Sequence, residues 1–182
     1  MAGDIHASKK SRALLITGGL ASGKTSVAIE LGELLERSNH FYAVIDLDFL
    51  CWARPDPHFA TSIHQLLVRN LVPVVQGFRD SGIDWFVLPR LIVNRDEFEL
   101  VRDALATAGI DDLTVVELTV ANAIALRRLQ SRDTGANLQA NLEDSASLDS
   151  APELASATFT TDATPIDEVA RDVLAHWLSA SP

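Results

Sequence analysis

The sequence predicts one α/β domain built around a parallel β-sheet. Short apolar runs alternate with segments of helical periodicity along the chain, which is typical of strands joined by crossover helices. The 182 residues are 47% hydrophobic, which is enough for one substantial core. A glycine-rich turn at residues 18–23 follows the first apolar run and precedes the first helical segment. We therefore expect a flexible tail at residues 1–12 and a single domain at residues 13–182.

Five strands and five helices are expected in alternation. The strand-like runs cover residues 13–17, 41–45, 83–88, 113–118 and 157–162. The helical segments cover residues 26–37, 59–80, 95–107, 121–132 and 165–178. Pro73 predicts an interruption of the second helix. Asn94 followed by Glu97 predicts a capped start of the third helix. Thr164 followed by Pro165 predicts the start of the last one, with proline in its favoured first position.

The glycine-rich turn has the G-x-x-x-x-G-K-T pattern of a phosphate-binding loop. Because it lies between a strand and a helix N-terminus, its backbone N–H groups and the helix dipole favour an anion. Lys24 would reach the β and γ phosphates, and the Thr25 hydroxyl would bind Mg²⁺. The expected nucleotide-binding residues are Gly18, Gly19, Leu20, Ala21, Ser22, Gly23, Lys24, Thr25 and Ser26. The loop predicts a site for ATP or another nucleoside triphosphate with Mg²⁺.

The bulk composition excludes several classes of function. The formal net charge is −10, and no basic stripe is present, so a nucleic-acid partner is not expected. No apolar run approaches the ~20 residues of a membrane span, and the start lacks the apolar core of a signal peptide. The single cysteine, Cys51, fits a reducing compartment. We expect a cytoplasmic protein that is a monomer or a homodimer.

The order of these features resembles the small P-loop kinases, a group related to the nucleoside monophosphate kinases. Its members include shikimate kinase, adenylylsulfate kinase, gluconate kinase and chloramphenicol phosphotransferase. The resemblance spans nearly the whole chain. It implies a three-layer P-loop NTPase fold with a five-stranded parallel sheet of order 2-3-1-4-5. It also implies an acceptor-binding cap at about residues 49–80 and a short lid at about residues 133–155.

Asp46 and Asp48 lie at the C-terminal end of the second strand, where ligands bind in open α/β sheets. One carboxylate there can support Mg²⁺ through its waters, and the other can accept the proton of an attacking hydroxyl. Asp48-Phe49-Leu50 resembles the D-x-L stretch that contains the catalytic aspartate of chloramphenicol phosphotransferase. We assign Asp48 as the base and acceptor anchor, and Asp46 to the metal. The reversed assignment stays open, as does a purely loop-capping role.

The end of the third strand departs from the usual pattern of P-loop enzymes. Many of them carry an acidic residue there, whereas this chain has Pro89-Arg90, and Asp84 lies at the opposite end of the strand. This departure makes Asp46 more important for the metal. Arg90 either contacts the acceptor or is solvated. Adenylylsulfate kinases carry a Ser-Pro motif at this place, and its absence disfavours that substrate.

Arg128 and Arg132 lie one helical turn apart after the fourth strand. In the nucleoside monophosphate kinases a pair at this place stacks on adenine and clamps phosphates. By that resemblance Arg128 covers the adenine and Arg132 stabilises the transferring phosphoryl group; the alternative is a solvated basic helix face. Thr164 and Pro165 belong to a loop that resembles the one around the adenine edge, although helix capping explains them equally well.

The cap segment carries polar and aromatic residues suited to a small hydroxylated molecule. They are Trp52, Arg54, His58, His64, Arg69 and Asn70. We expect Arg54, Arg69 and Arg90 to bind the acceptor, whereas Trp52 is alternatively a core residue and the histidines are alternatively solvated. The lid contains no Lys or Arg, which disfavours a nucleotide acceptor.

The sequence therefore predicts an ATP- and Mg²⁺-dependent phosphotransferase acting on a hydroxyl of a small molecule. Its expected catalytic residues are Lys24, Asp48 and Arg132. One alternative is a nucleoside or nucleotide kinase. A second is a regulatory nucleotide-binding protein or a partner-dependent ATPase, which would need a water-positioning residue or an arginine supplied by its partner.

Overall fold

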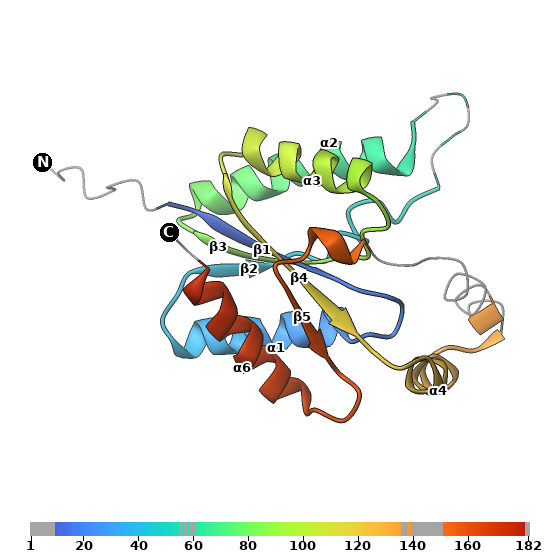
Figure 1. Ribbon diagram of the computed structural model, residues 1–182. Helices are drawn as coiled ribbons and strands as arrows, with labels where there is room; N and C mark the ends of the chain where they lie inside the picture. Colours follow the sequence, from blue (N-terminus) through green and yellow to red (C-terminus); the bar gives the residue numbers. More distant parts are fainter. Residues whose placement is uncertain are drawn as a thin grey trace, which may run out of the picture.

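The chain folds into a five-stranded parallel sheet with helices on both faces (Figure 1). The computed structural model describes residues 10–54, 56, 58, 61–135, 138–139 and 151–180. The strand order is β2-β3-β1-β4-β5, which confirms the predicted order. The strands are β1 (Arg12–Thr17), β2 (Tyr42–Val44), β3 (Trp85–Pro89), β4 (Asp112–Thr119) and β5 (Ala157–Thr160). The helices are α1 (Lys24–Arg37), α2 (Ile63–Asp80), α3 (Arg95–Thr107), α4 (Asn122–Arg132) and α6 (Ile166–Ser179).

Two apolar cores lie on the two faces of the sheet. In Figure 1, α2 and α3 cover the upper face, and α1 and α6 cover the lower one. Side chains alternate along β1, so Leu15 packs in the core with α2 and α3, whereas Leu14 and Ile16 pack in the core with α1 and α6. The second core includes the fully buried Trp177 of α6. Burial on both faces explains why the inner strands β1 and β3 read as nearly continuous apolar runs.

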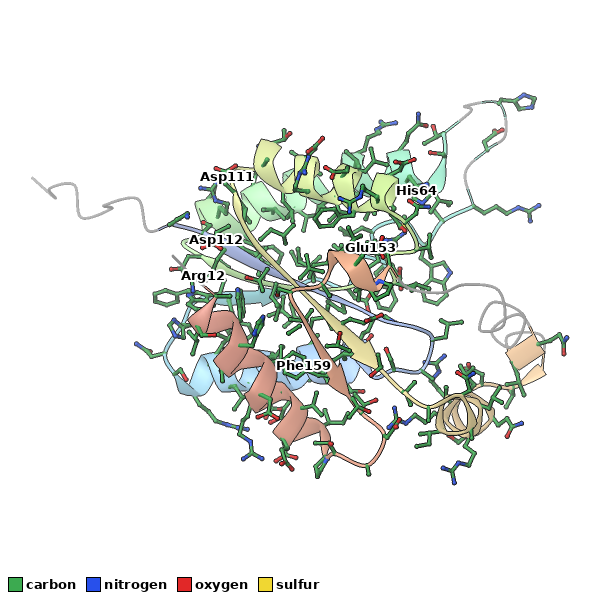
Figure 2. The ribbon with its side chains drawn as sticks, viewed as in Figure 1. Arg12, His64, Asp111, Asp112, Glu153 and Phe159 are labelled. Atoms are coloured by element: carbon green, nitrogen blue, oxygen red, sulfur yellow. The ribbon has the colours of Figure 1, made fainter. Side chains whose placement is uncertain are left out.

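The amino ends of the strands lie at the edge of the sheet opposite the phosphate loop. There Arg12 of β1 pairs with Asp112 of β4, with 3.5 Å between Nη2 and Oδ2 (Figure 2). The predicted tail, residues 1–12, falls mostly outside the described residues, and β1 already includes Arg12. Within the described residues no helix combines the length and apolar character that crossing a membrane requires.

Two predictions about helices are wrong. Helix α2 is continuous although Pro73 lies inside it, and it begins at Ile63 behind a capping box of Ser62 and Gln65. Its buried face, which includes Leu71, packs on the core and outweighs the roughly 3 kcal/mol that an internal proline costs.

The start of α6 also differs from the expectation. Pro165 occupies the N-cap position, the helix begins at Ile166, and no side chain caps it, so Thr164 does not serve as the cap. The expected cap of α3 is confirmed, because the side chain of Asn94 accepts a hydrogen bond of 2.9 Å from the backbone N–H of Glu97. Most of the expected lid at residues 133–155 lies outside the described residues, and its end forms a short 3-10 helix, Pro152–Leu154.

Candidate active site

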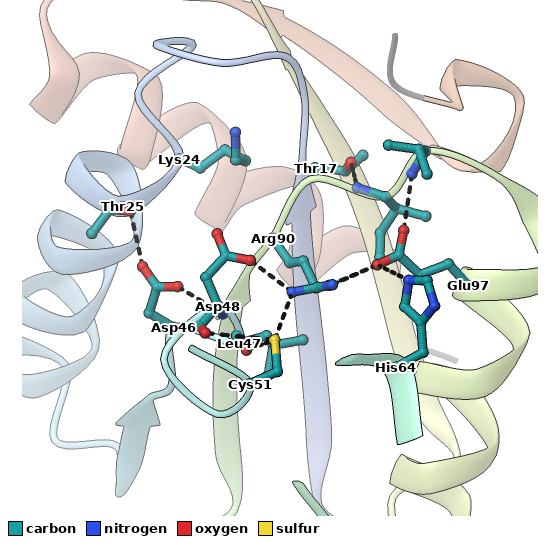
Figure 3. A network of polar contacts seen from close by, with 12 residues as sticks. Thr17, Lys24, Thr25, Asp46, Leu47, Asp48, Cys51, His64, Arg90 and Glu97 are labelled. Atoms are coloured by element: carbon teal, nitrogen blue, oxygen red, sulfur yellow. Dashed lines mark hydrogen bonds and ion pairs between the residues drawn. The ribbon is translucent and has the colours of Figure 1, made fainter. Parts of the chain in front are cut away.

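The predicted site residues gather at the carboxyl ends of the strands. The loop after β1 leads into α1, the turn after β2 carries the two aspartates, and Arg90 directly follows β3. Because the strands are parallel, these segments meet at one edge of the sheet, where open α/β sheets bind ligands. Figure 3 shows the resulting row of polar side chains, which runs from Thr25 through the aspartates and Arg90 to His64.

The glycine-rich loop has a conformation that its glycines require. Gly18 has φ 134° and Gly23 has φ 95°, both in a region that L side chains rarely adopt. A Cβ atom on Gly18 would also collide with the backbone carbonyl of Leu118. No side chain caps the start of α1, so its first N–H groups remain available for an anion. The loop therefore has the backbone of a phosphate cradle.

Lys24 is the first residue of α1, and its side chain reaches back to the loop. Its ammonium donates hydrogen bonds of 2.8 and 2.9 Å to the carbonyl oxygens of Gly18 and Gly19. Burial lowers the pKa of Lys24 to about 8, and the nearby carboxylates of Asp48 and Asp46 only partly oppose this shift. An anion bound in the loop would stabilise the charged form, so Lys24 is poised to bind phosphate.

Thr25 and Asp46 form an oxygen-rich pair beside Lys24. The Thr25 hydroxyl donates to Oδ2 of Asp46 at 3.1 Å, and Oδ1 of Asp46 accepts the backbone N–H of Asp48 at 3.1 Å. Mg²⁺ prefers oxygen ligands and usually keeps several waters, so two protein oxygens at the mouth of a phosphate loop suit it. The donor set fits the predicted metal role of Thr25 and Asp46.

Asp48 is held in place by a buried arginine. Arg90 Nη1 lies 2.7 Å from Oδ1 of Asp48, and Nη2 lies 2.7 Å from Oε1 of Glu97. The side chains of Arg90 and Glu97 are only 8% and 4% exposed, whereas that of Asp48 is 64% exposed. The predicted alternative of a solvated Arg90 is therefore wrong, because its guanidinium joins a buried carboxylate to an open one. A contact of Arg90 with the acceptor stays a prediction.

The charges in this row keep Arg90 and Asp48 in defined states. Burial lowers the pKa of Arg90, but Glu97 and Asp48 raise it by more, so the guanidinium remains charged. Partial burial raises the pKa of Asp48 above its ordinary value, while Arg90 pulls it down. Asp48 thus combines an exposed carboxylate, a fixed orientation and a proton affinity above that of a free aspartate.

Glu97 is the site residue that sequence reasoning missed. It was expected to complete the cap of α3, yet its Oε1 accepts from Arg90 Nε at 2.9 Å and its Oε2 accepts from the backbone N–H of Val93 at 3.2 Å. His64 of α2 extends the row, with Nε2 at 3.6 Å from Oε1 of Glu97. The signal available in the sequence is an acidic residue in the first helical turn after a strand that an arginine directly follows.

Arg128 connects the phosphate loop to the loop after β5. It donates to the carbonyl oxygen of Ala21 at 3.0 Å, and to the hydroxyl and carbonyl oxygens of Thr161 at 3.0 and 2.5 Å. The fully buried Thr161 in turn donates to the carbonyl of Ser22 at 2.9 Å. This bracing role was not predicted, and the contact of Arg128 with adenine stays a prediction.

Arg132 points to a different partner from Arg128. Its Nε and Nη2 each lie 2.9 Å from a carboxylate oxygen of Asp133, and its charge lowers the pKa of Lys24. Its contact with the transferring phosphoryl group stays a prediction. Thr164 and Pro165 lie in the loop after β5, which approaches the phosphate loop: a Cβ on Gly23 would lie 3.9 Å from the side chain of Thr161, the first residue of that loop.

The expected acceptor residues surround the turn after β2 and the start of α2. Trp52 is 80% exposed, so its predicted alternative as a core residue is wrong. Arg54 and Arg69 are exposed as well. A cavity of about 660 Å³ lies between the start of α2 and Leu100 of α3, and its walls include His64 and Arg69. These positions leave the side chains accessible to a small molecule.

Comparison with known proteins shows the fold but no family. No protein-family model and no curated protein matches the sequence. The solved APS kinase of Mycobacterium tuberculosis, in complex with AMPPNP and APS, is similar with a TM-score of 0.66 at 22% identity, over 94% of this chain and 99% of that one. The chain has the fold of the small P-loop kinases.

Two further kinases support the same conclusion about the fold. A sugar kinase from Janibacter sp. is similar with a TM-score of 0.61 at 17% identity, over 94% of this chain and 96% of that one. A gluconokinase from Sinorhizobium meliloti has a TM-score of 0.54 at 19% identity and covers 94% of each chain. The acceptors in these names differ among the three proteins, so similarity of fold selects none of them for this chain.

Proposed function

We propose that this protein transfers the γ-phosphoryl group of ATP to a hydroxyl of a small-molecule metabolite. The observation that carries the proposal is the ion pair between Asp48 and the buried Arg90, beside Lys24 of the phosphate loop. Binding of a nucleotide alone needs no oriented carboxylate next to the γ-phosphate position. Transfer to an alcohol does need one, because an alcohol is a weak nucleophile while it keeps its proton.

In the proposed reaction the acceptor oxygen forms a bond to the γ-phosphorus while the bond from that phosphorus to the β–γ bridging oxygen breaks. ADP leaves with the bridging oxygen, and the hydroxyl proton moves to the carboxylate of Asp48. The N–H groups of residues 18–25 and the ammonium of Lys24 hold the phosphates and stabilise their charge. Arg132 adds positive charge as the phosphoryl group moves.

Thr25 and Asp46 are proposed to hold Mg²⁺, which supplies positive charge to the β and γ phosphates when bound. The hydrogen bond between their side chains supports this assignment. Asp46 also accepts a hydrogen bond from the backbone N–H of Asp48, so a substitution of Asp46 that removed this bond would also disturb the position of the base. The protein is proposed to act in the cytoplasm, as a monomer or a homodimer.

A nucleoside or nucleotide acceptor remains the first alternative within the same reaction class. A nucleotide-dependent regulator is the second, and the absence of an acid after β3 counts against it. That position carries Pro89 and Arg90, and Arg90 is already bound to Asp48 and Glu97, so neither residue is suited to orient an attacking water.

A panel of hydroxylated metabolites, screened for ADP release with ATP and Mg²⁺, tests the proposal. We expect one group of related alcohols to raise ADP release well above the rate without acceptor, and Lys24→Ala to abolish that increase. ADP release that no alcohol stimulates, but that a protein partner does, would favour the regulatory alternative.

A further inference from the structure

Two aromatic rings lie exposed in the turn that also carries Asp48. Phe49 is 66% exposed and Trp52 is 80% exposed, the highest value among the exposed large hydrophobic residues of the described chain. Their ring centroids are 5.5 Å apart and the planes are tilted by 33°. Single exposed apolar side chains are ordinary, but two adjacent exposed rings form an apolar surface whose contact with water is unfavourable. A ligand that covers this surface would be stabilised by its burial.

The backbone that carries the rings is fixed rather than loose. Leu47 and Cys51 are buried on either side of Asp48 and Phe49, and N–H groups of the turn donate to carbonyls three residues earlier. The side chain of Asn70 in α2 also donates to the carbonyl oxygen of Leu50 at 2.6 Å. The backbone that carries the rings therefore has a defined position relative to the base, because Arg90 holds the Asp48 side chain of the same turn.

We propose that Phe49 and Trp52 form a stacking surface for the phosphate acceptor, and that the acceptor is an alcohol bearing a flat aromatic or heteroaromatic ring. This inference rests on the proposed function and specifies its substrate class. A flat ring stacked on the aromatic pair is desolvated on one face and held in orientation, while Asp48 of the same turn meets the hydroxyl. A flexible aliphatic polyol gains little from such a surface.

The position of the three tryptophans gives a direct binding assay. Trp85 and Trp177 are 6% and 0% exposed, so iodide in solution quenches mainly the fluorescence of Trp52. The probes are adenosine, uridine and 2-phenylethanol as ring-bearing alcohols, and glycerol and gluconate as ring-free ones. We expect the ring-bearing probes to protect Trp52 from iodide and the ring-free ones to leave quenching unchanged.

Kinetics of ADP release with the same probes provides the second readout. Trp52→Ala should raise KM for the best ring-bearing acceptor about tenfold, the usual effect of one stacking contact. Trp52→Phe should restore most of the loss, and the KM for ATP should not change. Phe41→Ala is the matched control, because Phe41 is 65% exposed but precedes β2 at the opposite edge of the sheet.

Three results would overturn the inference. The first is a best acceptor without a ring whose KM is the same in the Trp52→Ala and Phe49→Ala variants. The second is equal protection of Trp52 by glycerol and adenosine. The third is protection that grows with protein concentration in the absence of any probe, which would assign the rings to contact with a second copy of the chain.

Failure of the proposed function is distinguishable from failure of this inference. If no alcohol accepts phosphate but ring-bearing probes still protect Trp52, the stacking surface stands and the kinase proposal fails. If only ring-free alcohols accept phosphate, the kinase proposal stands and the stacking surface does not.

Discussion

Variants of the buried ion pair Arg90–Glu97 test separately how the pair stabilises the protein and how it positions Asp48. Arg90→Met leaves the carboxylate of Glu97, whose side chain is 4% exposed, without its cation. A buried charge that loses its partner destabilises a protein by about 3–5 kcal/mol, whereas the whole free energy of unfolding of a domain is about 5–15 kcal/mol. Arg90→Met should therefore unfold at a clearly lower urea concentration.

The double variant Arg90→Met/Glu97→Leu removes both buried charges. Replacing a buried ion pair by apolar groups is often close to neutral, and the lost hydrogen bond from the backbone N–H of Val93 costs about 1 kcal/mol. Most of the lost stability should return. Activity should not return, because Asp48 has lost the guanidinium that orients it, and a misplacement of about 1 Å costs about 10²-fold in rate.

The assay combines urea unfolding, followed by tryptophan fluorescence, with the pH profile of ADP release in the presence of the best acceptor. Arg90 lowers the pKa of Asp48, so its removal should move the acid limb of the profile to higher pH. A double variant that regained both stability and wild-type turnover, with an unchanged acid limb, would refute the positioning role of Arg90.

Four further predictions address the phosphate loop, the aspartates and Arg132. Asp48→Asn should keep ATP affinity in calorimetry and lower the rate of phosphoryl transfer by about 10²–10⁴. Asp46→Asn should instead raise the Mg²⁺ concentration that the reaction needs. The opposite pattern in a Mg²⁺ titration would reverse the two roles. The free Lys24 has a pKa of about 8 instead of 10.5, so it loses its proton as pH rises past 8. ATP affinity should then fall by up to tenfold per pH unit with proton uptake on binding, and pH-independent affinity up to pH 10 would contradict this reasoning. Gly18→Ala should abolish nucleotide binding because a Cβ collides with the carbonyl of Leu118, and a fluorescent ATP analogue that still bound normally would refute the cradle. Arg132→Ala should lower kcat more than it raises KM for ATP, since its proposed contact strengthens in the transition state, and a defect confined to KM would exclude that role.

The fold was predictable because its main signals are local. The alternation of Leu14 and Leu15 between two cores, the glycine-rich turn and the cap of α3 by Asn94 all follow from neighbours a few residues apart. Pro73 misled the prediction because tertiary packing holds α2 together across it. Thr164 misled it because several residue types at a loop end resemble a cap in sequence.

The motifs of the site were predictable from the sequence, but the contacts between its residues were not. The phosphate loop and the aspartates belong to short motifs with a known chemistry, and in the structure the carboxylate of Asp46 lies near enough to Lys24 to oppose the lowering of its pKa by burial. Arg128, in contrast, binds residues that lie 107 and 33 positions away in the chain. The spacing of residues within its own helix does not indicate these contacts. Arg90 likewise binds Asp48, which lies 42 positions away in the chain.

The fate of the γ-phosphoryl group tests the central claim most directly. ATP labelled with ³²P at the γ position is incubated with the protein, Mg²⁺ and the panel of alcohols, and the products are separated. We predict that the label appears in an organic phosphate, and that Asp48→Asn lowers this product without lowering ATP binding. Label found in inorganic phosphate alone, at a rate equal in the wild type and Asp48→Asn, would contradict the assignment of a phosphotransferase.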